Sequence, residues 1–421
     1  MAASEPCPEE TPLSPSDQLE EISKANTGGM TPQQRVDTAR RRVALVQIQD
    51  PDDHFKLGAA SLEMANAYLS ANMPAPAERH AERAEALLLA DAVNIEAAKL
   101  IPDAQLTLAN ALSEHANAIA AGQRAQANKA AEQARLHKLA ADTYHRALIS
   151  THSVFGKTHM ASCPVLRGWA QLAVHRSKEY GVARQLLQRE LQVRQDNQSQ
   201  KYVESAEEES AEPTTEDSEI PVVRRLLCEY MLHEADQLNA ADVVRATKLR
   251  RQAVDLLRQD ESTSAVLRLA DAYTGLEEWG EAESALSRAA SLVENDTGCC
   301  SRASATLWAK LGNCRLHLGK FNEAATDFEH VMNVITAIAG PLSDQLIQPA
   351  EQLCHARVML QEWVTAREAL GRAREVCSAR FGADHSDTRR LDHVLRSINE
   401  QVAAERVEAA EAAKATTSLC S

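Results

Sequence analysis

The chain has 421 residues, of which 44% are hydrophobic and only 4% aromatic, and its formal net charge is −15 at pH 7. This length exceeds what one hydrophobic core usually serves, so several domains or an elongated repeat array are expected. Few aromatic residues and many alanines favour close helix-on-helix packing and argue against a sheet-based fold. The acidic charge would repel a polyanion, which argues against nucleic acid as a partner.

Residues 1–30 are rich in Pro, Ser, Gly and Glu, a composition that cannot bury enough apolar surface to fold. We therefore expect a disordered N-terminal tail. Its first residues carry acid and proline where a secretory signal needs a basic start and an apolar run. No window of the chain approaches the apolar length that spans a bilayer. These features predict a cytoplasmic protein without membrane insertion.

Residues 31–198 form a predicted N-terminal repeat block, in which alanines and aromatic residues recur where two antiparallel helices would pack. The second helix of a degenerate first repeat is marked by Ala39, Val43 and Val46. Later repeats are marked by Ala65, Tyr68, Ala77, Ala81 and Ala84, then by Ala140, Tyr144 and Ala147, and then by Trp169, Leu172, Ala173, Ala183 and Leu187. The last of these fits only if the turn between its helices is about two residues short.

Residues 199–220 form a predicted acidic linker. Between Glu204 and Glu219 there are eight acidic residues and no basic one, with several serines and threonines among them. One interpretation is a solvated loop between two halves of the repeat array. The other is a segment whose phosphorylation tunes affinity for a basic partner.

Residues 221–394 form a predicted C-terminal repeat block with a regular period. Its clearest unit matches a tetratricopeptide repeat at positions 4, 7, 8, 15, 17, 20 and 24, through Trp308, Leu311, Gly312, Gly319, Phe321, Ala324 and Phe328. Arg315 replaces the usual tyrosine at position 11. Units beginning at residues 263, 305 and 347 give a period of 42 residues instead of the commoner 34. The chain is thus predicted to be an all-α tetratricopeptide-repeat superhelical solenoid of about seven or eight helical pairs.

Glycines recur where each second helix should end, at Gly156, Gly298, Gly340 and Gly382. Two of them begin Gly-x-x-His sequences, which end at His159 and His385 and could be mistaken for catalytic or phosphate-binding motifs. A phosphate loop would need several glycines between a strand and a helix. We therefore interpret these sequences as corners between repeats, with a left-handed glycine and a histidine that caps or packs.

Residues 395–421 form a predicted capping helix and tail, because Leu395, Ile398 and Val402 recur at helical spacing and a solenoid needs a polar-faced end. A short dimerising coiled coil is the alternative, so the sequence leaves the oligomeric state open.

No nucleotide, metalloprotease, hydrolase or calcium-binding motif occurs, so we expect no enzyme, no cofactor and no metal. A helical solenoid instead offers a concave groove lined by the first helix of each pair. Position 9 of that helix could look into the groove, where asparagines could bind the main chain of a partner segment. The predicted partner-binding residues are Asn66, Asn110, Asp271 and Asn313. The alternative is that polar residues occur there because the groove is wet.

Two stretches resemble the tetratricopeptide repeat protein 23 family: residues 52–88, and residues 163–174 with the sequence CPVLRGWAQLAV. The matching residues are His54, Lys56, Leu57, Ala65, Tyr68, Leu69, His80, Ala81, Glu82 and Ala84 in the first, and Cys163, Pro164, Leu166, Arg167 and Ala170 in the second. Gly58, the alanine-rich extension after residue 121 and the acidic linker depart from the family pattern.

The resemblance implies a non-enzymatic ciliary or flagellar scaffold whose partners are proteins of ciliary complexes. Animal members of the family are adaptors near the ciliary base that serve Hedgehog signalling through the Ellis-van Creveld complex. The 42-residue period and the Gly-x-x-His corners also resemble kinesin light chain repeats, so a cargo adaptor of that kind is an alternative. A structural component of the axoneme is a further one.

Overall fold

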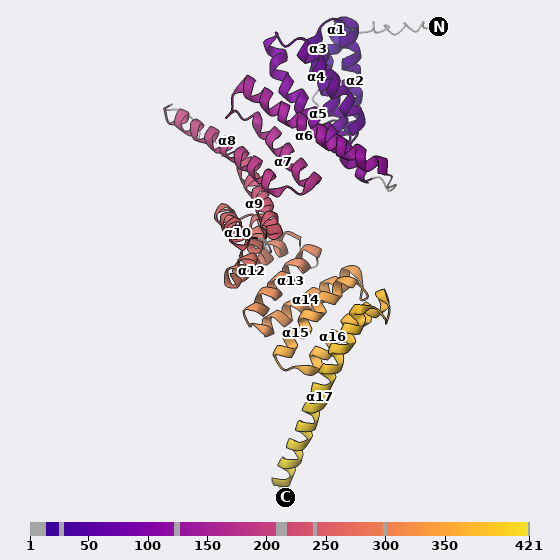
Figure 1. Cartoon of the computed structure of the whole chain (residues 1–421), viewed down its shortest axis with the longest axis vertical. Helices are drawn as coiled ribbons and strands as arrows, with labels where there is room; N and C mark the ends of the chain where they lie inside the picture. Colours follow the sequence, from indigo (N-terminus) through magenta and orange to yellow (C-terminus); the bar gives the residue numbers. More distant parts are fainter. Residues whose placement is uncertain are drawn as a thin grey trace, which may run out of the picture. The chain divides into compact units, whose positions relative to one another are not determined.

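The computed structural model describes residues 14–24, 29–121, 127–207, 217–238, 242–297 and 301–419. These residues form helices joined by short turns, and none of them lies in a strand, so the predicted all-α class is confirmed. The chain divides into two compact units, Met1–Val223 and Arg224–Ser421. Each unit is a stack of helical pairs of the tetratricopeptide-repeat type (Figure 1).

The first unit contains eight helices within the described residues and the beginning of a ninth. Their bounds are α1 Pro15–Lys24, α2 Pro32–Gln49, α3 His54–Ser70, α4 Pro74–Ala90, α5 Ile95–Ala121, α6 Ala127–Phe155, α7 Ser162–Ser177 and α8 Tyr180–Glu207. Helix α9, Glu219–Leu238, starts in the first unit and continues into the second.

The pairs of the first unit are α3 with α4, α5 with α6, and α7 with α8. Helix α4 also contacts α5, and α6 contacts α7. The alanines predicted to mark the repeats are buried at these contacts, where their small size lets the helix axes approach. Fully buried examples are Ala65, Ala77, Ala81, Ala84, Ala140, Ala147 and Ala183. The turn between α7 and α8 is indeed short, and Lys178 adopts a left-handed conformation there.

Helix α1 lies inside the segment that we expected to be disordered. It packs along α2, where the side-chain amide of Gln49 donates a 2.8 Å hydrogen bond to Ser16 Oγ and Leu19 contacts the apolar core. This contact supplies the apolar burial that composition alone did not suggest. The rest of residues 1–30, except residues 14, 29 and 30, lies outside the described residues.

The second unit continues α9 and then contains α10 Val243–Leu257, α11 Thr263–Gly275, α12 Trp279–Thr297, α13 Arg302–His317, α14 Phe321–Ala339, the short 3-10 helix η2 Asp344–Leu346, α15 Ile347–Met359, α16 Trp363–Phe381 and α17 Ser386–Leu419. The pairs α11 with α12, α13 with α14 and α15 with α16 follow the 42-residue period. Their register residues are buried as the repeat pattern predicts, among them Leu269, Ala282, Leu286, Leu311, Ala324, Phe328, Ala366 and Leu370.

The corners between repeats have the architecture that the sequence predicts. Gly156, Gly340 and Gly382 adopt φ values of +93°, +86° and +93°, which L side chains rarely adopt. Three residues later, a side chain accepts a hydrogen bond from the backbone N–H two residues further along: His159 Nδ1 at 3.1 Å, Ser343 Oγ at 3.4 Å and His385 Nδ1 at 3.3 Å. Gly298 lies outside the described residues.

The histidine corners are also packed against aromatic rings. The ring of Phe155 stacks on His159 with centroids 4.9 Å apart, and Phe381 stacks on His385 at 5.0 Å. A histidine that stacks on a phenylalanine and caps a turn has a structural role. The Gly-x-x-His sequences therefore form the corners between repeats.

The helix bounds differ in detail from the predicted domain ranges. Helix α8 extends through residues 199–207 of the predicted acidic linker, and α9 begins at Glu219, so only residues 208–216, which lie outside the described part, and residues 217 and 218 separate them. The terminal helix α17 begins at Ser386, before the predicted start at 395, and buries Leu391, Ile398 and Val402 against the unit. The domain ranges themselves remain a prediction.

Candidate protein-binding groove

The four predicted binding residues lie on first helices, as the repeat register requires. Asn66 is on α3 and Asn110 on α5 in the first unit, while Asp271 is on α11 and Asn313 on α13 in the second. Two of the four residues thus lie in each unit, and the first helices of each unit are considered as a candidate groove by themselves.

In three cases the side chain at position 9 of one first helix forms a hydrogen bond or an ion pair with the side chain at position 6 of the next first helix. Thr107 Oγ1 donates to Asn66 Oδ1 at 3.1 Å, Arg268 pairs with Glu229 at 2.6 Å, and Lys310 pairs with Asp271. Residues three apart share a helix face, so positions 6 and 9 of stacked helices can meet. Thr107, Arg268 and Lys310, at position 6, were not predicted from the sequence, and neither was Glu229. The signal for the two ion pairs is present in the sequence, because each joins opposite charges that are 39 residues apart.

Asn110 is engaged within its own pair. The hydroxyl of Tyr144, on α6, donates a 2.6 Å hydrogen bond to Asn110 Oδ1. Tyr144 is 2% exposed, and burial raises the pKa of its phenol well above the ordinary value, so the hydroxyl remains a donor. The oxygen of Asn110 is thus occupied by a contact that also fixes α5 on α6.

The ion pairs between positions 9 and 6 do not continue from α13 to α15, although Arg390 on α17 pairs with Glu351 on α15 at 2.6 Å. Position 9 of α13 is Asn313 and position 6 of α15 is Gln352, two half-buried amides that cannot form an ion pair. Each amide can donate and accept a hydrogen bond, as a peptide group does. Of the predicted residues, Asn313 is therefore the best placed to bind the main chain of a partner.

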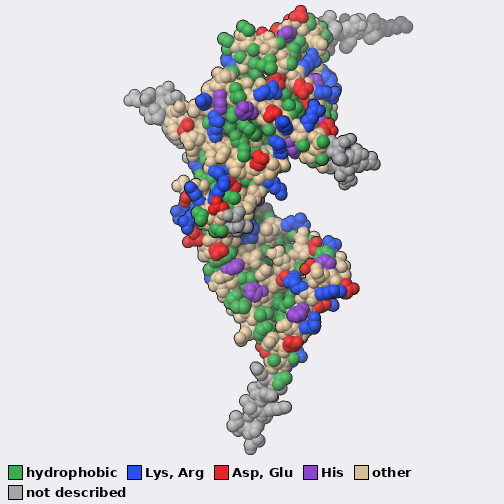
Figure 2. All heavy atoms as spheres, in the orientation of Figure 1, with side chains coloured by type: hydrophobic (Ala, Val, Ile, Leu, Met, Phe, Trp, Pro, Cys, Tyr) green, Lys and Arg blue, Asp and Glu red, His purple; other side chains and the backbone are tan. Residues whose placement is uncertain are grey.

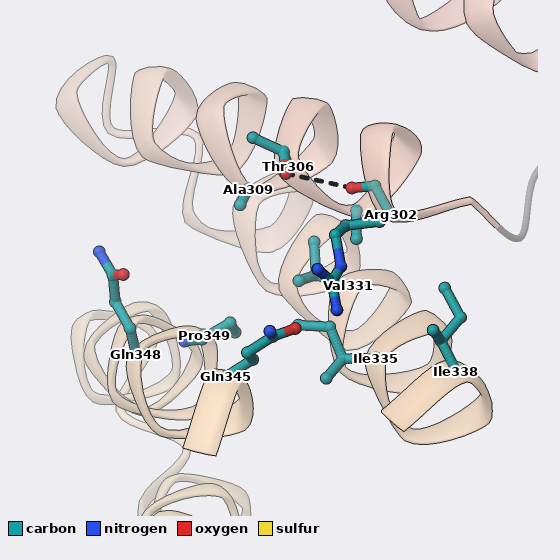
Figure 3. A pocket seen from close by; sticks show the side chains of 10 residues that line it. Arg302, Thr306, Ala309, Val331, Ile335, Ile338, Gln345, Gln348 and Pro349 are labelled. Carbon is teal, nitrogen blue, oxygen red and sulfur yellow. Dashed lines mark hydrogen bonds between the residues drawn. The ribbon is translucent and has the colours of Figure 1, made fainter. Parts of the chain in front are cut away.

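An apolar pocket opens about one helical turn from Asn313 on α13 and from Gln352 on α15 (Figure 3). Its volume is about 350 Å³, and it lies between α13, α14 and the start of α15. Its apolar lining consists of Ala305, Ala309, Val331, Ile335, Ile338 and Pro349. Its polar lining consists of Arg302, Thr306, Gln345 and Gln348.

The pocket is a consequence of the 42-residue period. The additional residues of each repeat lengthen α14 beyond Val331, which stands at position 27 of the unit that begins at residue 305, and Ile335 and Ile338 in this extension form one wall of the pocket. On the facing helix α13, Ala305 and Ala309 are too small to fill the space. A long second helix opposite small residues therefore leaves a hollow that a repeat of ordinary length would not build.

Several thiols in the described part of the chain are buried, and their burial affects their reactivity. Burial raises the pKa of Cys163 and of Cys354 to about 11, and that of Cys228 to about 12, so these thiols stay protonated at neutral pH and are poor nucleophiles. Among the described residues there is no group of three or more His, Cys, Asp or Glu side chains that could hold a metal ion. Within the same residues, no helix has the length and apolar character to cross a bilayer.

Residues 163–167, the Cys-Pro-x-Leu-Arg segment, have a structural role that was not predicted from the sequence. Arg167 Nη2 lies 2.6 Å from Glu190, whose side chain is fully buried, and Arg194 Nε lies 3.1 Å from the same carboxylate. The two arginines also pair with Glu219 and Asp217, at 2.7 and 2.8 Å. These ion pairs hold the end of the acidic segment, where α9 begins, against α7 and α8.

No protein-family model and no curated protein matches the sequence. Among solved structures, the chain is similar to BtubC (BKLC) from P. vanneervenii, with 15% identity, a TM-score of 0.41, and coverage of 59% of this chain and 91% of that one. It is also similar to the TPR2AB domain of yeast Sti1 in complex with pHSP90, with 12% identity, a TM-score of 0.26, and coverage of 82% of this chain and 98% of that one. The helices and their pairwise packing by themselves define the fold.

Proposed function

We propose that the protein is a non-enzymatic scaffold that binds extended segments of partner proteins on its first-helix faces. The observation that carries the proposal lies between α13 and α15, where positions 9 and 6 both carry amides that cannot form an ion pair and an apolar pocket opens nearby. Main-chain binding by amides together with a side-chain pocket is a general way to hold an extended peptide.

The surface charge of the described residues fits a protein partner. Acidic and basic side chains lie next to one another over much of the face seen in Figure 2, with hydrophobic side chains between them. Interspersed charges favour specific pairing with a polar partner surface over the sequence-independent attraction of a single-sign patch.

The main experiment compares two double variants of the full-length chain. Asn313→Ala with Gln352→Ala removes both groove amides, while Asn322→Ala with Asn333→Ala removes two exposed amides from the second helix α14. Each is expressed as a proximity-labelling fusion. We expect the groove variant to lose a set of labelled proteins that the control variant retains. Identical labelling by both variants would contradict the proposal.

We further propose that the protein acts in cilia or flagella and that its partners belong to ciliary protein complexes. The support is the resemblance of residues 52–88 and 163–174 to the tetratricopeptide repeat protein 23 family. The test is to locate the tagged chain in ciliated cells and to extract the cilia with detergent and then with salt. Absence from cilia would contradict this part, and resistance to extraction would identify an axonemal component instead of a soluble adaptor.

A further inference from the structure

We infer that the apolar pocket between α13, α14 and α15 takes an aliphatic side chain of an extended partner segment that carries Asp or Glu two residues away, with that carboxylate paired to Arg302. The inference rests on the proposed binding function and names the chemistry of the segment that is bound.

The shape of the pocket favours a side chain over a flat surface contact. Its volume of about 350 Å³ lies near the lower end of the range of small-ligand pockets. Aliphatic groups form its floor and walls, and Ile338 is 47% exposed at its edge. An occupant that covered this edge would remove apolar surface from water, which is the main source of favourable free energy in such a contact.

Arg302 gives the pocket its charge preference. It is the one charged residue of the lining, it is exposed, and its guanidinium points into the pocket (Figure 3). Among the side chains that the structure describes, no carboxylate forms an ion pair with it. Because a guanidinium matches a carboxylate with two parallel hydrogen bonds, an acidic side chain on the same side of the segment as the inserted one would be favoured and a basic one repelled.

The polar rim suits an extended main chain. Gln345 and Gln348 are exposed on the side of the pocket formed by η2 and α15, and their amides can pair with the N–H and C=O groups of a peptide. Successive side chains of an extended segment point to opposite sides, so side chains two residues apart point to the same side. The aliphatic residue can therefore enter the pocket while the main chain stays at the rim and an acidic residue two positions away reaches towards Arg302.

The test is a selection of random peptides displayed between two flexible linkers, so that only internal residues are sampled, on the purified full-length chain. The wild-type chain should enrich an aliphatic residue with Asp or Glu two positions away. Arg302→Glu should change the preference to an aliphatic residue with Lys or Arg two positions away, because the charge of the rim is reversed. Arg302 follows the N-cap of α13, where an acidic residue is tolerated well, so this variant should fold.

Two further variants isolate the pocket from general effects. Ala309→Phe fills the hollow and should abolish the enrichment, with folding checked by circular dichroism. Arg288→Glu reverses an exposed charge on the second helix α12, outside the pocket, and should leave the enrichment unchanged. In the best wild-type peptide, changing the acidic residue to its amide should weaken binding, measured by fluorescence anisotropy, by about tenfold or more.

The possible outcomes separate the inference from the proposed function. If the wild-type chain enriches no peptide, the proposed function is contradicted. If it enriches peptides that lack the aliphatic–acidic pair, or whose binding is unchanged by both Arg302→Glu and Ala309→Phe, the inference is overturned while the proposed function stands.

Discussion

Phe328 on α14 packs directly on the backbone of α13 at Gly312. A Cβ atom at residue 312 would lie 2.9 Å from Cζ of Phe328, closer than such atoms pack, and Phe328 is itself fully buried. We therefore expect Gly312→Ala to lower the free energy of unfolding by about 1 to 3 kcal/mol, because the ring or the helix must shift. Chemical denaturation of the full-length chain measures the change.

Gly371 on α16 provides the matched control, because an added Cβ there meets no atom within 4 Å. Gly371→Ala should raise stability by about 0.5 to 1 kcal/mol through the higher helix propensity of alanine. Equal effects of the two substitutions would show that Phe328 on α14 does not pack on the backbone of α13 at Gly312.

Gln361 occupies a strained turn between α15 and α16. Its φ is +61°, whereas Gly319 has φ +74° at the corresponding position between α13 and α14. We expect Gln361→Gly to stabilise the protein by about 0.5 to 1 kcal/mol, because glycine removes the left-handed strain at some cost in unfolded-state entropy. The reverse change, Gly319→Gln, should destabilise it by a similar amount. If both changes destabilise, the strain at Gln361 is relieved by contacts of its side chain.

The repeats could be predicted from the sequence because their signals are local and recur. Ala270, Gly312 and Cys354 occur 42 residues apart at the same small position of three first helices, and large residues oppose each of them on the second helix. The corner histidines could be assigned for the same reason, because the preceding glycine fixes where the helix ends. The period therefore determined the fold without any knowledge of long-range contacts.

The chemistry of the groove could be predicted only in part. The register placed Asn313 and Asp271 on first helices, but whether a side chain is free depends on its neighbour in the next repeat. Lys310 forms an ion pair with Asp271, and the hydroxyl of Tyr144 donates a hydrogen bond to Asn110. Both contacts depend on how the helices stack. The pocket beside Arg302 was not found because it is an empty space between three helices, which no motif marks.

Asp327 links stability to pH. Arg315, which replaces the usual tyrosine of the repeat, lies 2.7 Å from the Asp327 carboxylate, and the Asp327 side chain is 3% exposed. Burial raises the pKa of Asp327 to about 6, although Arg315 acts in the opposite direction. The unfolded pKa is about 3.9, so the folded state keeps the proton to higher pH. This contribution to stability is complete below about pH 4 and is lost as the pH rises through about 6.

The measurement is the difference in free energy of unfolding between the wild-type chain and Asp327→Asn. The amide keeps the shape of the side chain but cannot ionise, so the wild-type chain should lose stability relative to the variant between about pH 4 and pH 7. The same comparison with Asp384→Asn, at a side chain that is 96% exposed, gives the baseline. If the stability difference between wild type and variant stays constant with pH, or changes in the opposite direction, the effect of Arg315 on the pKa of Asp327 equals or exceeds that of burial.

The buried carboxylate of Glu190 should be the most sensitive point of the first unit. Replacing it with glutamine leaves Arg167 and Arg194 facing an uncharged group, and breaking a buried ion pair in this way costs about 3 to 5 kcal/mol. Because Arg167 and Arg194 also pair with residues at the start of α9, hydrogen exchange should become faster in α7 and around residues 217–223. Asp196→Asn, on the same helix but half-exposed, should change stability by less than about 0.5 kcal/mol. If exchange in α7 responds equally to both variants, the arginines are not held by Glu190, and the Cys-Pro-x-Leu-Arg segment has some role other than fixing the start of α9.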